Sequence, residues 1–160
     1  MPRLSRIIRN GQTIPVTLIN LVKTYPRLFG QIHDLVPYRG ELMIESETPQ
    51  TGWAIIPHES PQESLGRTYS EQNQSMRIIG PAIGLPSHFV RRRTLVETVY
   101  DLIVCRLVLN IPIQSETVDW TTSGTGKKSF SSVYNAEEGI RIRDLPSSTR
   151  HGMLGSSPTW

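Results

Sequence analysis

The densest apolar stretch of the chain spans residues 95–108 and has the spacing of a helix. Valine, leucine, isoleucine and tyrosine fill most of its positions, so apolar side chains cover more than half of a helical circumference. Thr94 and Glu97 stand at the start in the capping-box pattern, in which each side chain bonds a free amide of the first turn. Asn110 is expected to end the helix. We therefore predict a central helix over 94–110 that is packed on two sides.

Alternating and clustered apolar residues predict two hairpins in the first third of the chain. Asn10-Gly11 is a favoured pair for a tight hairpin turn, with short strands on either side within 6–16. The second hairpin has apolar arms at 41–45 and 53–57, joined by a loop that contains proline and glycine.

Helical spacing also marks residues 17–36, where Thr17 is a suitable cap and Pro26 divides the stretch into two short helices. Within the polar region that follows the second hairpin, a short helix is expected over 70–79, with Met76 and Ile79 inward. Residues 80–86 combine glycine and proline and are expected to be irregular.

The last part of the chain alternates between apolar and polar positions with period two. Strands are expected over 117–122, 128–134 and 140–143, connected as a meander. Residues 145–160 are rich in proline, serine and glycine, have no period, and are expected to be either extended or docked by a few apolar side chains.

These elements predict an α+β fold with one small domain over 1–144 and an irregular C-terminal tail over 145–160. The central helix is expected to pack against the antiparallel hairpins and the meander. The expected core consists of Leu21, Leu28, Phe29, Leu42, Ile44, Ile55, Leu95, Val99, Leu102, Ile103, Leu107, Val118, Val133, Ile140 and Ile142.

The chain is weakly basic, with a net charge of +3 and a pI of about 9.3. Fourteen of its 17 basic residues are arginines, whose planar guanidinium groups suit phosphates and carboxylates. Arg91, Arg92 and Arg93 stand just before the central helix, where the helix dipole disfavours cations. We take this triplet as a candidate anion- or partner-binding site. The alternative is that the arginines pair with nearby Glu97 and Asp101. Trp160 is a candidate anchor on a partner or on the domain itself.

Other reactive residue types give weaker signals. The single cysteine, Cys105, lies among apolar residues of the central helix and is expected to be buried and inert, and one cysteine excludes an intrachain disulfide. His58-Glu59 is a candidate acid/base pair in the polar segment 58–75, whereas a hydrated loop histidine is the plainer interpretation. Neither metal-ligand spacing nor a complete phosphate-binding loop is present, although 123–128 resembles the latter superficially.

Three hypotheses of function remain open. The first is a non-enzymatic binding or assembly protein that acts through protein–protein contacts and an Arg-rich patch, either with a protein partner or as a homo-oligomer. The second is a nucleic-acid-associated protein that uses Arg91–Arg93. The third is a small enzyme with its acid/base site in 58–75, which we rank below the non-enzymatic hypotheses. We expect no cofactor, no metal, no catalytic residue set and no membrane association, and a cytoplasmic location.

Overall fold

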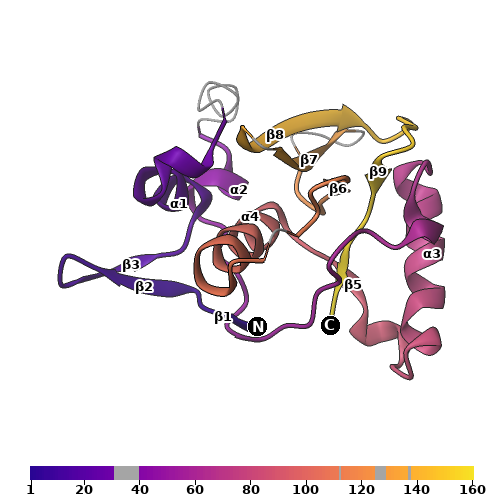
Figure 1. Cartoon of the computed structure of the whole chain (residues 1–160), viewed down its shortest axis with the longest axis horizontal. Coiled ribbons are helices and arrows are strands. Elements are labelled where there is room, and N and C mark those ends of the chain that lie inside the picture. Colours follow the sequence, from indigo (N-terminus) through magenta and orange to yellow (C-terminus); the bar gives the residue numbers. More distant parts are fainter. Residues whose placement is uncertain (31–39, 112, 125–128, 137) are drawn as a thin grey trace.

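The computed structural model describes residues 1–30, 40–111, 113–124, 129–136 and 138–160, and it has a mixed α+β fold (Figure 1). Its helices are α1 (Leu18–Thr24), α2 (Leu42–Glu45), α3 (Tyr69–Ala82) and α4 (Leu95–Val104). Shorter turns of helix are η1 (Pro26–Leu28), η3 (Gln62–Ser64) and η4 (Ser87–Phe89), together with the π-helical turn η5 (Cys105–Leu109).

The strands form one four-stranded sheet and several two-stranded pairs. The sheet has the order β8-β7-β6-β9, with β9 parallel to β6 and the other neighbours antiparallel. The pairs are β1–β4, β2–β3 and β5–β10. Bounds are β1 Pro2–Arg3, β2 Arg6–Arg9, β3 Gln12–Pro15, β4 Gly52–Trp53, β5 Arg91–Arg92, β6 Val118–Trp120, β7 Ser129–Ala136, β8 Gly139–Pro146, β9 Leu154–Gly155 and β10 Pro158–Thr159.

Helix α4 occupies the centre of the molecule, as the sequence predicts. It begins at the expected cap, because the Thr94 hydroxyl accepts from the Glu97 amide and the Glu97 carboxylate accepts from the Thr94 amide. Every residue of α4 from Leu95 to Ile103 is buried. Figure 1 shows α1 and α2 on one side of α4 and the sheet on another, with α3 on the far flank. The prediction of a central helix with neighbours on two sides is confirmed.

The hairpin at Asn10-Gly11, the cap at Thr17 and the meander are also confirmed. Asn10 and Gly11 have positive φ angles of 50° and 77°, as a type I′ turn requires. The side chain of Thr17 accepts from the amide of Asn20 at the start of α1. Strands β6, β7 and β8 pair in the expected order. The second helix expected within 17–36 and the loop within 123–126 lie partly outside the described residues.

The second expected hairpin is wrong. Residues 42–45 form the short helix α2, with Met43 and Ile44 buried and Leu42 exposed. A short apolar run does not distinguish strand from helix by its period, and here burial against α4 selects the helix. The other arm pairs instead with β1, where Pro2 lies opposite Trp53. As a result the side chain of Ile55 is exposed rather than in the core.

Two further expectations need correction. Helix α3 continues to Ala82, into the segment expected to be irregular, although Pro81 has no amide to donate in its last turn, and Gly80 allows Val90 to approach closely. Leu107 was expected in the core, but its side chain is 51% exposed. It lies in η5, beyond the part of α4 on which β7, α1, α2 and β1 pack.

The C-terminal residues pack into the fold. Strand β9 lies beside β6, and β10 lies beside β5. Residues 154–159 are all buried, including Ser156 and Ser157 with no exposed surface. Figure 1 shows this segment passing between α4 and α3 toward the end marked C. Of the two arrangements expected for 145–160, the structure therefore has the docked one at 154–159.

Candidate functional site

Arg91 and Arg92 point to opposite sides of β5, because successive side chains of a strand alternate between its faces, and Arg93 follows the strand. Arg92 and Arg93 are buried, whereas the side chain of Arg91 is 42% exposed. Strand β5 pairs with β10, with Arg92 opposite Pro158 and Arg91 opposite Thr159. The triplet therefore lies where the C-terminal segment meets the start of α4.

Arg93 lies between two buried carboxylates. Its Nη2 donates to Asp119 at 2.7 Å and its Nη1 to Asp101 at 3.1 Å, while Nε donates to the carbonyl of Ser157. Asp101 also accepts from the guanidinium of Arg3, with 2.9 Å between Nε and Oδ1. All four charged side chains are almost fully excluded from water. Charge-assisted bonds of this kind are among the stronger ones in proteins.

Glu97 extends the same set of charges toward the surface. Both oxygens of its carboxylate accept from Arg91, at 2.6 and 2.7 Å, and Arg3 lies 3.4 Å away. Burial favours the neutral carboxyl group, but the bonds from Arg91 and from the Thr94 amide and the charge of Arg3 outweigh burial and lower the pKa of Glu97. Opposite charges thus alternate along one continuous group, which we call the ion-pair chain: Asp119, Arg93, Asp101, Arg3, Glu97 and Arg91.

Arg92 has a different environment without a carboxylate bonded to it among the described residues. Its Nη1 donates to Gln72 at 3.0 Å and to Ser156 at 2.9 Å, and Nη2 donates to Asn73. The guanidinium carbon lies 4.0 Å from the centre of the Tyr69 ring, a cation–π contact. Burial lowers the pKa of Arg92, in spite of the opposing influence of Tyr69 and Asp119. Arg92 thereby connects α3 to the C-terminal segment.

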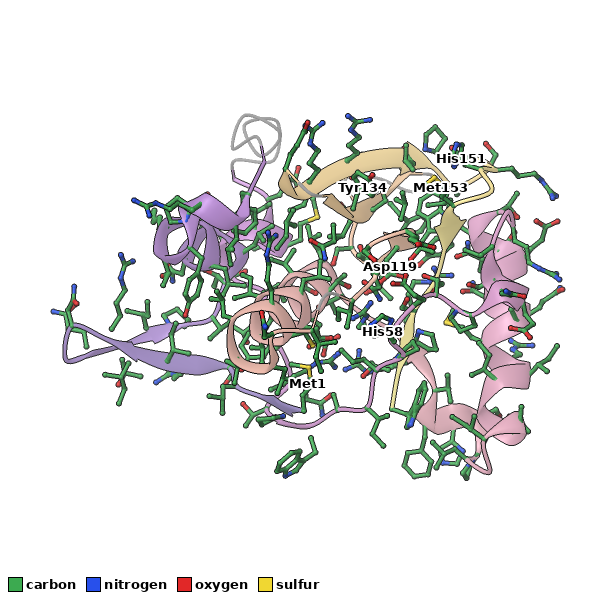
Figure 2. All side chains as sticks on the ribbon, viewed as in Figure 1. Met1, His58, Asp119, Tyr134, His151 and Met153 are labelled. Carbon is green, nitrogen blue, oxygen red and sulfur yellow. The ribbon has the colours of Figure 1, made fainter. Side chains whose placement is uncertain are left out.

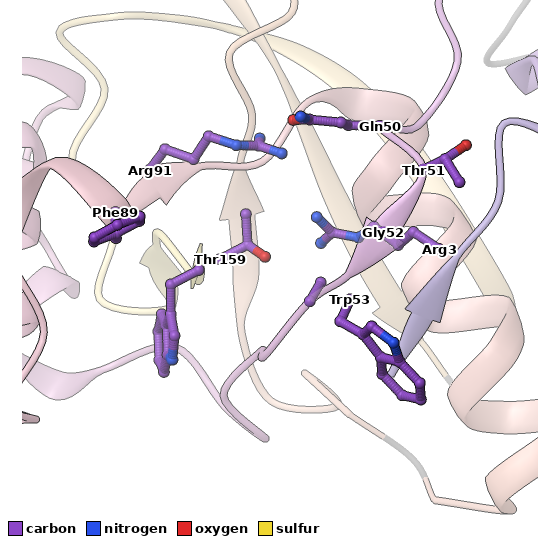
Figure 3. A pocket seen from close by; sticks show the side chains of 10 residues that line it. Arg3, Gln50, Thr51, Gly52, Trp53, Phe89, Arg91 and Thr159 are labelled. Carbon is purple, nitrogen blue, oxygen red and sulfur yellow. The ribbon is translucent and has the colours of Figure 1, made fainter.

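Arg91 and Trp160 line the same pocket, which has a volume of about 200 Å³ (Figure 3). Trp53 and Phe89 also line it, and they are 84% and 57% exposed. Arg3 contributes the inner wall. The structure therefore brings together two of the four sequence-predicted site residues in one aromatic pocket and separates them from Arg92 and Arg93, which are buried.

An apolar groove lies next to this pocket, and Ala54 lines both. Its volume is about 280 Å³. Leu109 and Ile111 line it and are exposed, and Leu107 and Val108 of the adjoining η5 are exposed as well. We define the apolar groove by its lining: Met1, Ala54, Ile55, Ile56, His58, Cys105, Leu109, Ile111 and Ile113.

Sequence reasoning missed this groove because it treated the apolar residues of 94–110 as one buried helix. The helix geometry changes at Cys105, and the chain then turns at Asn110, whose left-handed conformation lets the amide of Ile111 bond the carbonyl of Cys105. The sequence signal that could have indicated the groove is Ile111, an apolar residue that lies beyond Asn110, where the helix ends.

The other candidate residues, His58, Glu59 and Cys105, lie outside the aromatic pocket. The nitrogen Nδ1 of His58 lies 3.6 Å from Glu59, and both side chains are accessible to water. Glu59 accepts from the amide and hydroxyl of Ser115 and from Thr117, so its carboxylate holds the loop before β6. The buried position of Cys105 is confirmed, and burial raises the pKa of its thiol. Within the described ranges, histidine, cysteine and acidic side chains form no group that could hold a metal ion.

Comparison of the chain with protein-family models, curated proteins and solved structures gave no match in any of the three. In the part of the chain that the structure describes, no helix has both the length and the apolar character needed to cross a membrane.

Proposed function

We propose that the chain is a non-enzymatic assembly protein, in which the apolar groove of one copy binds the projecting hairpin of another. The observation that carries the proposal is the exposure of large aliphatic side chains that line the apolar groove, where Ile55 is 59% and Leu109 49% exposed. Contiguous apolar surface of this kind is typical of interaction sites. The half-exposed Arg91 lines the adjoining pocket.

The hairpin β2–β3 supplies the complementary surface. Figure 1 shows it extending away from the body of the molecule. Ile8 near its turn is 78% exposed, and most of its other side chains are exposed too. A two-stranded hairpin is marginally stable in water, and its outer edges offer unpaired backbone groups. Docking on an apolar surface would stabilise the hairpin and cover Ile8.

A contact between two different surfaces of the same chain is heterologous. Each copy can insert its hairpin into one neighbour and accept the hairpin of another in its groove. Association therefore continues until a ring closes or a filament forms. This property separates the proposal from a symmetric dimer, in which one patch meets its own copy.

Sedimentation velocity over a wide range of protein concentration tests the proposal. We expect the wild-type chain to associate with rising concentration and both Ile8→Asp and Leu109→Asp to remain monomeric. Ile78→Asp is the matched control, because Ile78 is 69% exposed on α3, away from both surfaces, and it should associate like the wild type.

Mixing the two monomeric variants gives the sharpest result. Ile8→Asp retains an intact groove and Leu109→Asp an intact hairpin, so the mixture should form heterodimers that contain one copy of each and grow no further. A monomeric wild type would overturn self-assembly, and a mixture that stays monomeric would overturn the pairing of hairpin with groove.

A further inference from the structure

The outer face of the four-stranded sheet places an aromatic ring and two guanidinium groups side by side. Val118 of β6 lies opposite Tyr134 of β7, which lies opposite Arg141 of β8. In the neighbouring row Ser132 lies opposite Arg143. Residues that alternate with these along β7 and β8 are buried in the core. Because Ser132 is small, the face is hollow beside the Tyr134 ring.

The segment after β8 encloses this hollow, where His151 and Met153 form a wall. Figure 2 shows Tyr134, His151 and Met153 near one another at the sheet. The resulting sheet groove has a volume of about 340 Å³ and a mainly apolar lining that includes Val118. That volume lies at the lower end of the range for small-molecule sites, roughly 300–1,000 Å³.

Helix α3 covers only a neighbouring part of the same face. Tyr69 stacks on Phe130 with 3.7 Å between ring centres and packs edge-on against Trp120. Those aromatic rings are therefore already in contact with one another, and Tyr134 takes no part in that cluster. Tyr134 is instead half-buried and lines the sheet groove.

The charge of the sheet groove is positive. Arg141 and Arg143 line it together with His151, and none of the described residues of the lining carries a carboxylate. Arg141 bonds Glu138 outside the groove. Arg143 is exposed and makes no ion pair within the described residues. His151 accepts from the Met153 amide through Nδ1, so Nε2 is the nitrogen that can contact a ligand.

From this arrangement we infer that the sheet groove binds a nucleotide unit, with the base stacked on Tyr134 and the phosphate held by Arg143 and Arg141. Bases stack on aromatic side chains in grooves that attract the phosphate backbone, and this combination binds single strands with little sequence preference. A guanidinium group pairs well with phosphate oxygens. A free nucleotide and one unit of single-stranded RNA share this chemistry, and the inference does not depend on self-assembly.

Fluorescence anisotropy of labelled oligouridine and oligoadenine RNA, measured with the full chain at two salt concentrations, tests the inference. Tyr134→Leu keeps an apolar side chain but removes the ring, and we expect it to weaken binding about tenfold. Arg143→Ala should weaken binding and reduce the slope of log affinity against log salt by about 0.7, the value for one phosphate contact on a single strand. Arg77→Ala on exposed α3 removes the same charge elsewhere and should leave affinity within about twofold. Circular dichroism melts check that each variant is folded.

Competition with adenosine and uridine monophosphates distinguishes the two sources of the ligand. Displacement of RNA at comparable concentrations of monophosphate supports a free-nucleotide site, and displacement only by unlabelled RNA supports a strand-binding site. Equal loss of affinity in Arg77→Ala and Arg143→Ala would overturn the inference, because binding would then reflect net charge alone. Unchanged affinity in folded Tyr134→Leu, or binding to anionic lipid vesicles without binding to RNA or monophosphates, would overturn it as well.

Discussion

The two ends of the helical segment 95–109 reverse the usual distribution of charge and hydrophobicity. Near its start, Glu97 and Asp101 are buried at 2% and 0% exposure. Near its end, Leu107 and Val108 are 51% and 73% exposed. The charged end has all its partners within the chain, since each buried carboxylate meets a guanidinium group. The apolar end is exposed to water in the structure. We therefore expect the first end to determine stability, and we propose that the second takes part in association.

The ion-pair chain holds together segments that are far apart in the sequence. Arg3 reaches Asp101 across 98 positions, and Arg93 reaches Asp119 across 26. Replacing a buried ion pair by well-packed apolar residues is often neutral, whereas removing one partner leaves an uncompensated charge in the interior. The ion-pair chain therefore makes the position of the N-terminal strand and of the C-terminal segment depend on each other.

The largest effect is expected for Asp101→Asn, which removes the carboxylate between Arg3 and Arg93. Both guanidinium groups would stay buried without their shared partner, and the free energy of unfolding should fall by about 3–5 kcal/mol. Urea denaturation followed by circular dichroism measures the change. Glu116→Gln removes a charge from an exposed position and should change stability by no more than about 0.5 kcal/mol. Similar small effects of both variants would show that the ion-pair chain does not stabilise the fold.

Glu97→Gln should produce a smaller, pH-dependent effect. Glutamine retains the capping-box pattern but loses the charge that bonds Arg91, so stability at neutral pH should fall by about 1–3 kcal/mol. The pKa of Glu97 is lowered in the folded chain, so its contribution is present above the unfolded pKa of about 4.3 and is lost as pH falls through the lower folded pKa. Wild type and variant should thus converge in acid. Parallel curves of unfolding free energy against pH would contradict this assignment.

Thr94→Ala tests the start of the same helix. The hydroxyl of Thr94 accepts from the Glu97 amide, and its loss should cost about 1 kcal/mol of stability. Thr94→Ser keeps a hydroxyl at the cap and should behave nearly as the wild type in the same urea titration. Equal stability of the alanine and serine variants would show that the cap contributes nothing here.

Local chemistry explains which parts of the fold were predictable. The caps at Thr17 and Thr94, the turn at Asn10-Gly11 and the alternation around Ile142 act through neighbours in sequence, and the structure confirms them. The prediction of a hairpin over 41–57 was wrong because the conformation of this segment depends on contacts that are remote in sequence. Residues 42–45 pack against α4, and β4 pairs with β1.

The candidate site was predictable only in part, for a similar reason. Arg91–Arg93 stand out in the sequence because cations are disfavoured at the start of a helix. Their pairing with Glu97 and Asp101 is the alternative that the sequence offers, and the structure shows such pairs. Nothing near Arg93 in the sequence indicates Asp119 as its partner, because that contact depends on the placement of β6. Likewise, the pairing of Tyr134 with Arg141 and of Ser132 with Arg143 in the sheet groove depends on strand register, which the spacing of residues along the sequence does not determine.

The smallest effect on stability is expected at the exposed end of the helical segment, for Val108→Thr. Threonine has almost the shape of valine, and at this exposed position its hydroxyl bonds water, so the free energy of unfolding should change by less than about 0.5 kcal/mol. Val99→Thr is the matched control, because Val99 has no exposed surface and the same hydroxyl would enter the core at a cost of about 1–3 kcal/mol. Val108→Thr should nevertheless weaken self-association in sedimentation velocity, because it makes the exposed apolar end of the segment more polar next to Leu109, which lines the apolar groove. A loss of stability at Val108 as large as at Val99 would mean that the exposed end is packed within the monomer, and the comparison between the two ends of the segment would fail.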